Sequence, residues 1–174
     1  MKHILVLLTG LTLCFADNPS IVTDTICDEF EQYMLVYTKD SELYGNSYHE
    51  QAFLNFAKYV DTTDTAYLLV LEHVGNDWIF IKEGRSLFIK CDDTIMSFVT
   101  KRCPDRKTYG MGMVRETAQY PVDTEQMRKI AYAKSGKVKI KGGNKDLVRT
   151  IGNKNYVIFR RFVDNIINKK NENR

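Results

Sequence analysis

Histidine is scarce in this sequence, and the motifs of common metal and nucleotide sites are absent. Only three of the 174 residues are histidine, which excludes a histidine-rich metal site. His49-Glu50 lacks the second histidine, four residues later, that the zinc-protease helix motif requires. Gly110 and Gly112 are followed by neither a third glycine nor the Gly-Lys-Ser/Thr of a phosphate-binding loop. We therefore expect no resident metal and no cofactor.

Long apolar runs are also missing, except for one at the N-terminus. Residues 4–15 carry no charge and follow Lys2, but they are fewer than the roughly 20 apolar residues that a membrane-spanning helix needs. Ala16 is small enough to precede a cleavage point, and the polar Asp17 follows it. We expect residues 1–16 to be a cleavable signal peptide, so that the protein is periplasmic or secreted and retains no transmembrane span.

A lipoprotein alternative stays open for the same segment. In this alternative Cys14 is acylated and becomes the first residue of the mature chain. Leu13 argues against it, because the bacterial lipobox has a small residue at that place. Acylation would move the protein onto a membrane surface.

Cysteine is sparse, and its number is odd once the signal peptide is removed. Cys27, Cys91 and Cys103 remain, and their spacings match neither C-x-x-C nor a zinc pattern. Cys91 and Cys103 lie at the ends of neighbouring predicted strands, which an antiparallel return would bring together. We expect a disulfide between these two, worth about 3 kcal/mol for so short a loop, with Cys27 unpaired. The alternative is that all three are small buried apolar residues.

The composition indicates neither disorder nor a second domain. A hydrophobic fraction of 44% is ordinary for a globular protein, and the chain after the signal has the length of one domain with its own core. We expect residues 17–168 to form a single small domain and residues 169–174 to form a disordered polar tail. The fold class that the patterns predict is α+β, with an antiparallel β-meander and packed helices.

Strands dominate the predicted centre of the chain. Turn-forming residues at 75–77, 83–85 and 92–93 separate apolar runs, and such short connections join antiparallel neighbours. The predicted meander comprises residues 67–74, 78–82, 87–90, 95–101 and 110–120. Upstream, residues 33–37 are ambiguous between a strand and a buried turn. Residues 49–60 are predicted to be a helix, because their apolar positions fall at helical spacing: Ala52, Phe53, Phe56, Ala57 and Val60.

The last third of the chain carries the strongest local signals. Asp123 and Gln126 form a capping-box pattern, which predicts a helix over residues 124–134. Apolar residues alternate with lysines after it, and a Gly-Gly-Asn turn at 142–144 predicts a hairpin that returns over residues 147–151. A final helix is predicted over residues 154–168, with Asn153 as its cap.

Charge is segregated along the sequence. Residues 17–124 hold 10 Lys and Arg against 18 Asp and Glu, a net charge of −8, whereas residues 125–174 hold 14 against 4, a net charge of +10. A basic surface on the hairpin and final helix would attract an anionic envelope component or an acidic protein. The candidate residues are Lys137, Lys139, Lys141, Lys145, Arg149, Arg160 and Arg161. The alternative is that these cations only protect an edge hairpin or pair with the acidic remainder of the chain.

Glu116 is the carboxylate that is hardest to assign. It lies in a predicted strand between Arg115 and Thr117, where an exposed carboxylate is the commoner case. The alternative is a buried partner for an arginine. Other acidic residues, such as Asp92 and Asp93, are of the kind that forms turns.

Two functions from different classes stay open. The first is a non-catalytic exported protein that binds a macromolecule, as an envelope adaptor or an inhibitor. The second is a small secreted hydrolase with an unrecognised active site. We favour the first, because no catalytic residues are recognisable: Glu72 and His73 point to opposite faces of their strand. Nucleic acid is not an expected partner, because the aromatic residues near the cations belong to the predicted core.

Overall fold

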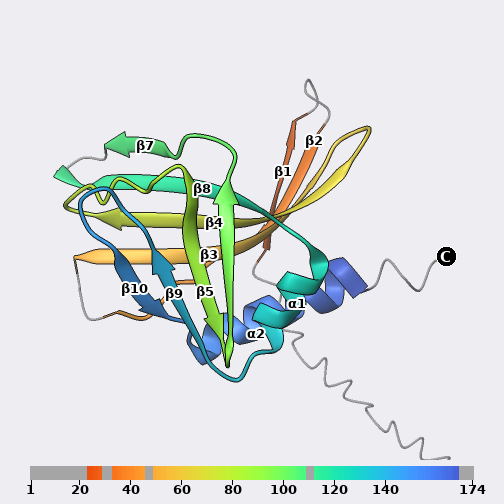
Figure 1. Ribbon diagram of the computed structural model, residues 1–174. Coiled ribbons are helices and arrows are strands. Elements are labelled where there is room, and N and C mark those ends of the chain that lie inside the picture. The colour runs from red at the N-terminus through yellow and green to blue at the C-terminus, as the bar shows by residue number, and fades with distance from the viewer. Residues whose placement is uncertain (1–22, 29–32, 46–48, 109–111, 169–174) are drawn as a thin grey trace, which may run out of the picture.

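The chain folds into two antiparallel sheets and two packed helices, which is the α+β class that the sequence predicts (Figure 1). The computed structural model describes residues 23–28, 33–45, 49–108 and 112–168. The predicted signal peptide, residues 1–16, and the predicted tail, residues 169–174, lie outside the described residues. Among the described residues, no helix is both long and apolar enough to cross a bilayer.

The larger sheet has six strands and the smaller sheet has four. The order in the larger sheet is β1 (Thr23–Asp28), β2 (Tyr33–Thr38), β3 (Glu50–Val60), β4 (Thr65–Gly75), β8 (Val114–Val122) and β7 (Asp105–Thr108). The order in the smaller sheet is β10 (Leu147–Thr150), β9 (Gly136–Ile140), β5 (Gly84–Cys91) and β6 (Thr94–Thr100). In Figure 1 the strands of the smaller sheet run across those of the larger sheet.

One apolar core joins both sheets and the helices α1 (Thr124–Tyr132) and α2 (Asn153–Phe162), which lie together at one end of the sheets in Figure 1. Phe56 of β3 stacks on Phe159 of α2, with ring centroids 4.3 Å apart. The hydroxyl groups of Ser86 and Tyr120 lie 2.9 Å apart and link the two sheets inside this core. The helices therefore close the open end of the layer between the sheets.

The segment 49–60 is a strand, and the helix predicted there is wrong. Ala52, Leu54 and Phe56 are completely buried at every second position, which is the period of a strand. The helical spacing of the predicted stripe omits Leu54. β3 pairs with β4 along its whole length, from Glu50 opposite Gly75 to Val60 opposite Thr65. Pairing with a neighbouring strand thus overrides the local helical pattern.

The predicted single meander is also wrong, because its strands divide between two sheets. β4 pairs with β8 and not with the next strand in the chain, and β5 pairs with β6 and β9. Residues 78–82 are not a strand of either sheet. They carry the chain from the larger sheet to the smaller one, and Ile81 makes only an isolated bridge to Gly142.

Cys91 and Cys103 are both free, so the predicted disulfide between them is wrong. Cys91 pairs with Thr94 at the tight turn of the β5–β6 hairpin, whereas Cys103 follows Thr100 at the open end. The length of β6 separates these ends by roughly 20 Å at about 3.3 Å per residue, far beyond the reach of a disulfide. Cys91 is buried, and burial raises the pKa of its thiol to about 11.

The predicted C-terminal elements are confirmed. In α1 the amide of Gln126 donates to the Asp123 side chain at 2.7 Å, and the Gln126 side chain accepts from the Asp123 amide at 3.1 Å. β9 and β10 form the predicted hairpin. The last helix begins one residue earlier than expected, and Asn153 is its first residue and not its cap. The cap is Gly152, whose amide donates to the side chain of Asn155. A π-helical segment, Val163–Asn168, continues α2.

Candidate functional site

A buried carboxylate, Glu116 of β8, organises the most polar part of the interior. Its side chain has no exposed surface, and the pairing of β8 places it opposite His73 of β4 on one side and Arg106 of β7 on the other. Three charged or titratable residues therefore form a row across three neighbouring strands, and Glu116 is its centre. The sequence alternative of a buried glutamate with an arginine partner is confirmed.

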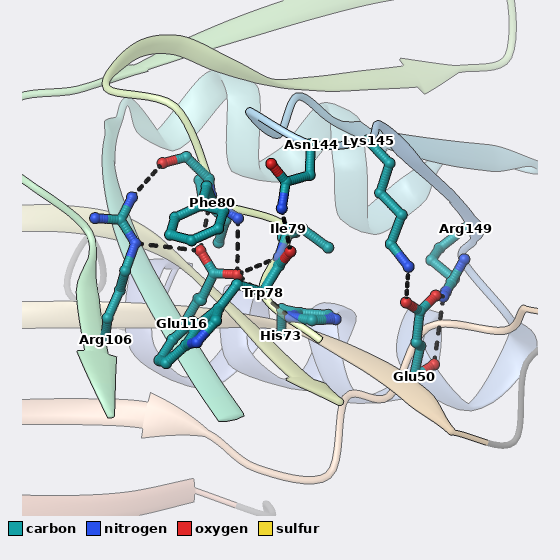
Figure 2. A network of polar contacts seen from close by, with 11 residues as sticks. Glu50, His73, Trp78, Ile79, Phe80, Arg106, Glu116, Asn144, Lys145 and Arg149 are labelled. Carbon is teal, nitrogen blue, oxygen red and sulfur yellow. Dashed lines mark hydrogen bonds and ion pairs between the residues drawn. The ribbon is translucent and has the colours of Figure 1, made fainter. Parts of the chain in front are cut away.

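Glu116 accepts hydrogen bonds from three consecutive backbone amides of the segment that crosses between the sheets (Figure 2). The amides of Ile79 and Phe80 donate to Oε1 at 2.7 and 3.0 Å, and the amide of Ile81 donates to Oε2 at 2.8 Å. Hydrogen bonds to an ionised acceptor are about twice as strong as neutral ones. The carboxylate thereby fixes the backbone of residues 79–81.

Arg106 holds the same segment from the opposite side. Its Nε lies 3.4 Å from Oε2 of Glu116, and its Nη2 donates to the carbonyl oxygen of Ile81 at 3.1 Å. The guanidinium also lies over the ring of Phe80, 5.4 Å from the centroid. One arginine thus balances the buried charge and supports an aromatic side chain.

His73 is completely buried beside Glu116. Its Nδ1 lies 3.7 Å from Oε1 of Glu116, which is too long for a hydrogen bond but close enough for attraction. In the described part of the chain, neither ring nitrogen of His73 has a hydrogen-bond partner. The imidazole does not reach solvent and is therefore not placed to act on a dissolved substrate.

The pKa of Glu116 is held at about 2. Burial alone would raise this pKa, but the neighbouring His73 and the amides of Ile81, Ile79 and Phe80 outweigh it. Glu116 is therefore ionised at neutral pH, with its oxygens occupied by the protein itself. This arrangement is suited to holding a loop rather than to transferring a proton.

Phe80 has a backbone conformation that is unusual for its side chain. Its φ angle is 56°, in the left-handed region. Asp40 and Asp92 share this region in the described residues, but aspartate visits it readily and a bulky aromatic residue does not. Such strain costs about 1–3 kcal/mol and persists only where the surroundings enforce it. Here the hydrogen bond from the Phe80 amide to Glu116 and the contact with Arg106 hold Phe80 in this conformation.

The β9–β10 turn fastens the crossing segment from a second side. The amide of Gly143 donates to the carbonyl oxygen of Phe80 at 2.8 Å. The side-chain amide of Asn144 donates to the carbonyl oxygen of Trp78 at 3.2 Å. A Cβ on Gly142 would lie 2.3 Å from the carbonyl oxygen of Ile79, so only glycine allows the approach. Figure 2 shows Asn144 directed toward Trp78.

These contacts present two aromatic rings beside a shallow cavity. The rings of Trp78 and Phe80 are 6.1 Å apart and inclined by 33°, and Phe80 is 41% exposed. Together with Asp77, Asn144 and Lys145 they line a cavity of about 350 Å³. We call these five residues the aromatic shelf. A volume of this size is at the lower end for small-molecule sites.

Glu50 gathers two of the predicted surface cations beside the shelf. Lys145 bonds to Oε1 of Glu50, and Nη2 of Arg149 lies 3.6 Å from Oε2 (Figure 2). The hydrogen bond from Lys145 is the largest cause that lowers the pKa of Glu50. Arg149 is nearly buried, because it lies opposite Val138 on the inner face of the hairpin.

The structure does not bring the seven predicted cations onto one surface. Lys139 pairs with Asp146 at 2.9 Å, and Lys141 lies over the ring of Phe88. Arg160 donates to the carbonyl oxygen of Ala131 and, with Arg161, belongs to α2. Only the lysines of β9, Lys137 and Lys139, share the outer face of the hairpin, with Lys141 at its end. Intramolecular pairing with acidic residues accounts for Lys139, Lys145 and Arg149.

Sequence reasoning missed the aromatic shelf. The sequence patterns place Trp78 and Phe80 in an ordinary strand and Asn144 in a turn, and of the five shelf residues only Lys145 is among the predicted site residues. Nothing in the sequence patterns indicates a role for Arg106. One signal was present: the only tryptophan of the chain directly follows the turn residues Asn76 and Asp77. In the described residues, no group of three or more His, Cys, Asp or Glu side chains is placed to hold a metal ion.

We predict that Glu116 makes stability depend on acid pH. Its pKa is about 2 in the folded protein and ordinarily 4.5, so its contribution of about 3 kcal/mol is complete above pH 4.5 and is lost as pH falls toward 2. Urea unfolding across this range measures it. Glu116→Gln should lower the free energy of unfolding by about 3–5 kcal/mol at neutral pH and flatten the acid dependence.

Glu125→Gln provides the matched control for that measurement, because Glu125 is an exposed residue of α1. It should change stability by no more than about 0.5 kcal/mol and leave the acid dependence intact. An acid dependence that is equally steep in Glu116→Gln and in the natural protein would contradict the assignment.

We predict that glycine is tolerated better than alanine at position 80. Phe80→Gly and Phe80→Ala both remove the ring, but only glycine relieves the left-handed strain, so it should be more stable than alanine by about 1 kcal/mol. At Phe88, which lies in the interior of β5, the order should reverse, because glycine weakens a strand. Urea unfolding of the four variants decides it, and the same order at both positions would refute the strain.

No protein-family model, no curated protein and no solved structure matches this chain.

Proposed function

We propose that this chain is an exported, non-catalytic binding protein and that the aromatic shelf is its binding site. The pattern of residues 1–16 supports export to the periplasm or the medium. The observation that carries the proposal is the enforced exposure of Phe80 beside Trp78. The function is to hold a ligand against two rigid aromatic rings.

Preorganisation supports binding as the role of this site. Burying a carboxylate, leaving a histidine without a hydrogen-bond partner among the described residues and holding a phenylalanine in the left-handed region each cost free energy that other contacts must offset. All three features meet at residues 79–81 and their contacts. Binding groups that are already fixed lose less conformational entropy when a ligand arrives. We infer that the free energy spent on these three features keeps the binding surface rigid.

The secreted-hydrolase alternative receives less support from the same geometry. An enzyme needs a nucleophile or a titratable acid–base pair within reach of the substrate. Glu116 and His73 are both completely buried, and the oxygens of Glu116 are already bonded. The ionisable residues that line the shelf are Asp77 and Lys145, and Lys145 is paired with Glu50.

The outer face of the smaller sheet supports a second candidate, the binding of an acidic protein, as an inhibitor or an adaptor would. Lys90 of β5 lies directly opposite Lys137 of β9, and such like-charge pairs are unfavourable without an external anion. Exposed apolar side chains lie on the same sheet. They are Ile95 (68%) opposite Lys90, Val148 (54%) opposite Lys139 and Val99 (47%) opposite Arg85. Cations with apolar neighbours complement an acidic protein surface.

We predict that small aromatic and polar compounds bind at the shelf. A fragment library screened by amide chemical shifts on isotope-labelled protein should give perturbations that cluster at residues 77–80 and 142–145. Emission from Trp78, the only tryptophan, reports the same site. Phe80→Gly should remove these responses while the protein stays folded. Fragments that cluster elsewhere, with none at the shelf, would overturn the proposal.

We predict, for the second candidate, that acidic polypeptide binds through the lysines of the hairpin. Polyglutamate binding should weaken with added salt and weaken further when Lys137, Lys139 and Lys141 are all replaced by Gln. The matched control replaces Lys129, Lys134 and Lys154, which are exposed residues elsewhere, and removes the same charge. Equal loss in both triple variants would leave only a nonspecific charge effect and reject this face.

A further inference from the structure

We propose that the aromatic shelf binds a neutral saccharide chain, with a pyranose ring packed against Trp78 and Phe80. This inference rests on the proposed function, because it names the ligand class of the same site. It is argued from the rings, the charges around them and the depth of the cavity.

The two rings suit a flat ligand with apolar faces. Their planes differ by 33° and their centroids are 6.1 Å apart, so the two rings form one aromatic cluster beside the cavity. The C–H groups on one face of a pyranose ring pack on such a surface, because aromatic rings carry negative charge density on their faces. The cation near Phe80, Arg106, lies over its ring and is tied to Glu116 and Ile81, so it is already engaged.

The charge of the lining disfavours phosphorylated ligands. The shelf residues include one carboxylate, Asp77, and one ammonium, Lys145. The ammonium is balanced by Glu50, which leaves Asp77 to repel a phosphate group. A nucleotide or nucleic acid strand, which also stacks on aromatic rings, needs a basic groove for its backbone. The stacking surface is therefore better matched to a ligand without charge.

The polar lining also disfavours a wholly apolar ligand. Asp77, Asn144 and Lys145 supply a carboxylate, an amide and an ammonium around the two rings, and burying them against hydrocarbon would leave hydrogen bonds unmade. Asn144 is held by its bond to the carbonyl oxygen of Trp78, and Lys145 is held by Glu50. Fixed hydrogen-bonding groups around an aromatic floor complement a ring that carries hydroxyl groups at its edge.

The depth of the cavity favours a chain over a single sugar. Four of the five shelf residues are exposed, and only Trp78 is half-buried. A shallow site encloses little of a small ligand, whereas deep pockets bury most of it. It does, however, leave both ends of a polymer free to continue past the rings. Several weakly held sugar units then contribute together.

Emission from Trp78 provides the direct test. The full mature chain is titrated with neutral β-1,4-linked glucose and N-acetylglucosamine oligosaccharides and with an α-1,4-linked glucose oligosaccharide. At least one should give a saturable emission change. Phe80→Gly should lower its affinity about tenfold or more, as loss of one stacked ring worth roughly 1.4 kcal/mol implies. Val157→Ala, which removes an exposed apolar side chain from α2, should leave affinity unchanged.

The arms of the experiment separate the ligand class from the site. Saccharide binding that Phe80→Gly weakens about tenfold or more and that Val157→Ala retains supports the proposal. Saturable binding of a single-stranded oligonucleotide, with no response to any of the saccharides, overturns the saccharide class and leaves the shelf as a binding site. Fragment binding at residues 77–80 with no saccharide response likewise overturns the saccharide class and leaves the shelf as a binding site. No response to any probe overturns both the saccharide class and the proposed function.

Discussion

The hydrogen bonds between the Glu116 carboxylate and the amides of residues 79–81 are the interaction on which the rest of the structure depends. Removing a carboxylate from water costs several kcal/mol unless its oxygens are bonded again. Three amides and Arg106 supply those bonds, so the chain must cross over β8 at this point. After β4 this crossing takes the chain out of the larger sheet, so that β5 lies in the smaller sheet beside β6 and β9.

Departures from ordinary protein chemistry converge on one place in this molecule. His73 is buried and has no hydrogen-bond partner in the part of the chain that the structure describes. Phe80 has a left-handed backbone, and Gly142 lies too close to the crossing segment for any side chain. The sheets around them follow simple alternation, as in β9, where lysines face out and apolar residues face in. When a protein departs from the usual rules of local structure, the departure tends to lie at a functional site. The aromatic shelf, Asp77, Trp78, Phe80, Asn144 and Lys145, lies where these departures meet.

Some of the charge that is segregated along the sequence is paired in the folded chain. Glu50, from the acidic part of the sequence, binds Lys145 and approaches Arg149 from the basic part. Arg149 also turns inward because strand alternation places it opposite Val138. Net charge by segment therefore overestimated the basic surface. The exposed cations form a smaller patch that includes Lys90 of β5 and Lys137 of β9. These two lysines lie directly opposite each other on neighbouring strands.

Local sequence signals suffice to predict α1, the β9–β10 hairpin and the last helix, because these signals act between close neighbours. Asp123 and Gln126 are three residues apart and bond directly to each other. Contacts between distant parts of the chain make residues 49–60 a strand, place Cys91 and Cys103 at opposite ends of a hairpin, and let Glu116 hold the shelf. Glu116 is 37 residues from Ile79. No local pattern specifies a hydrogen bond over that separation, because its energy exists only after the sheets have assembled.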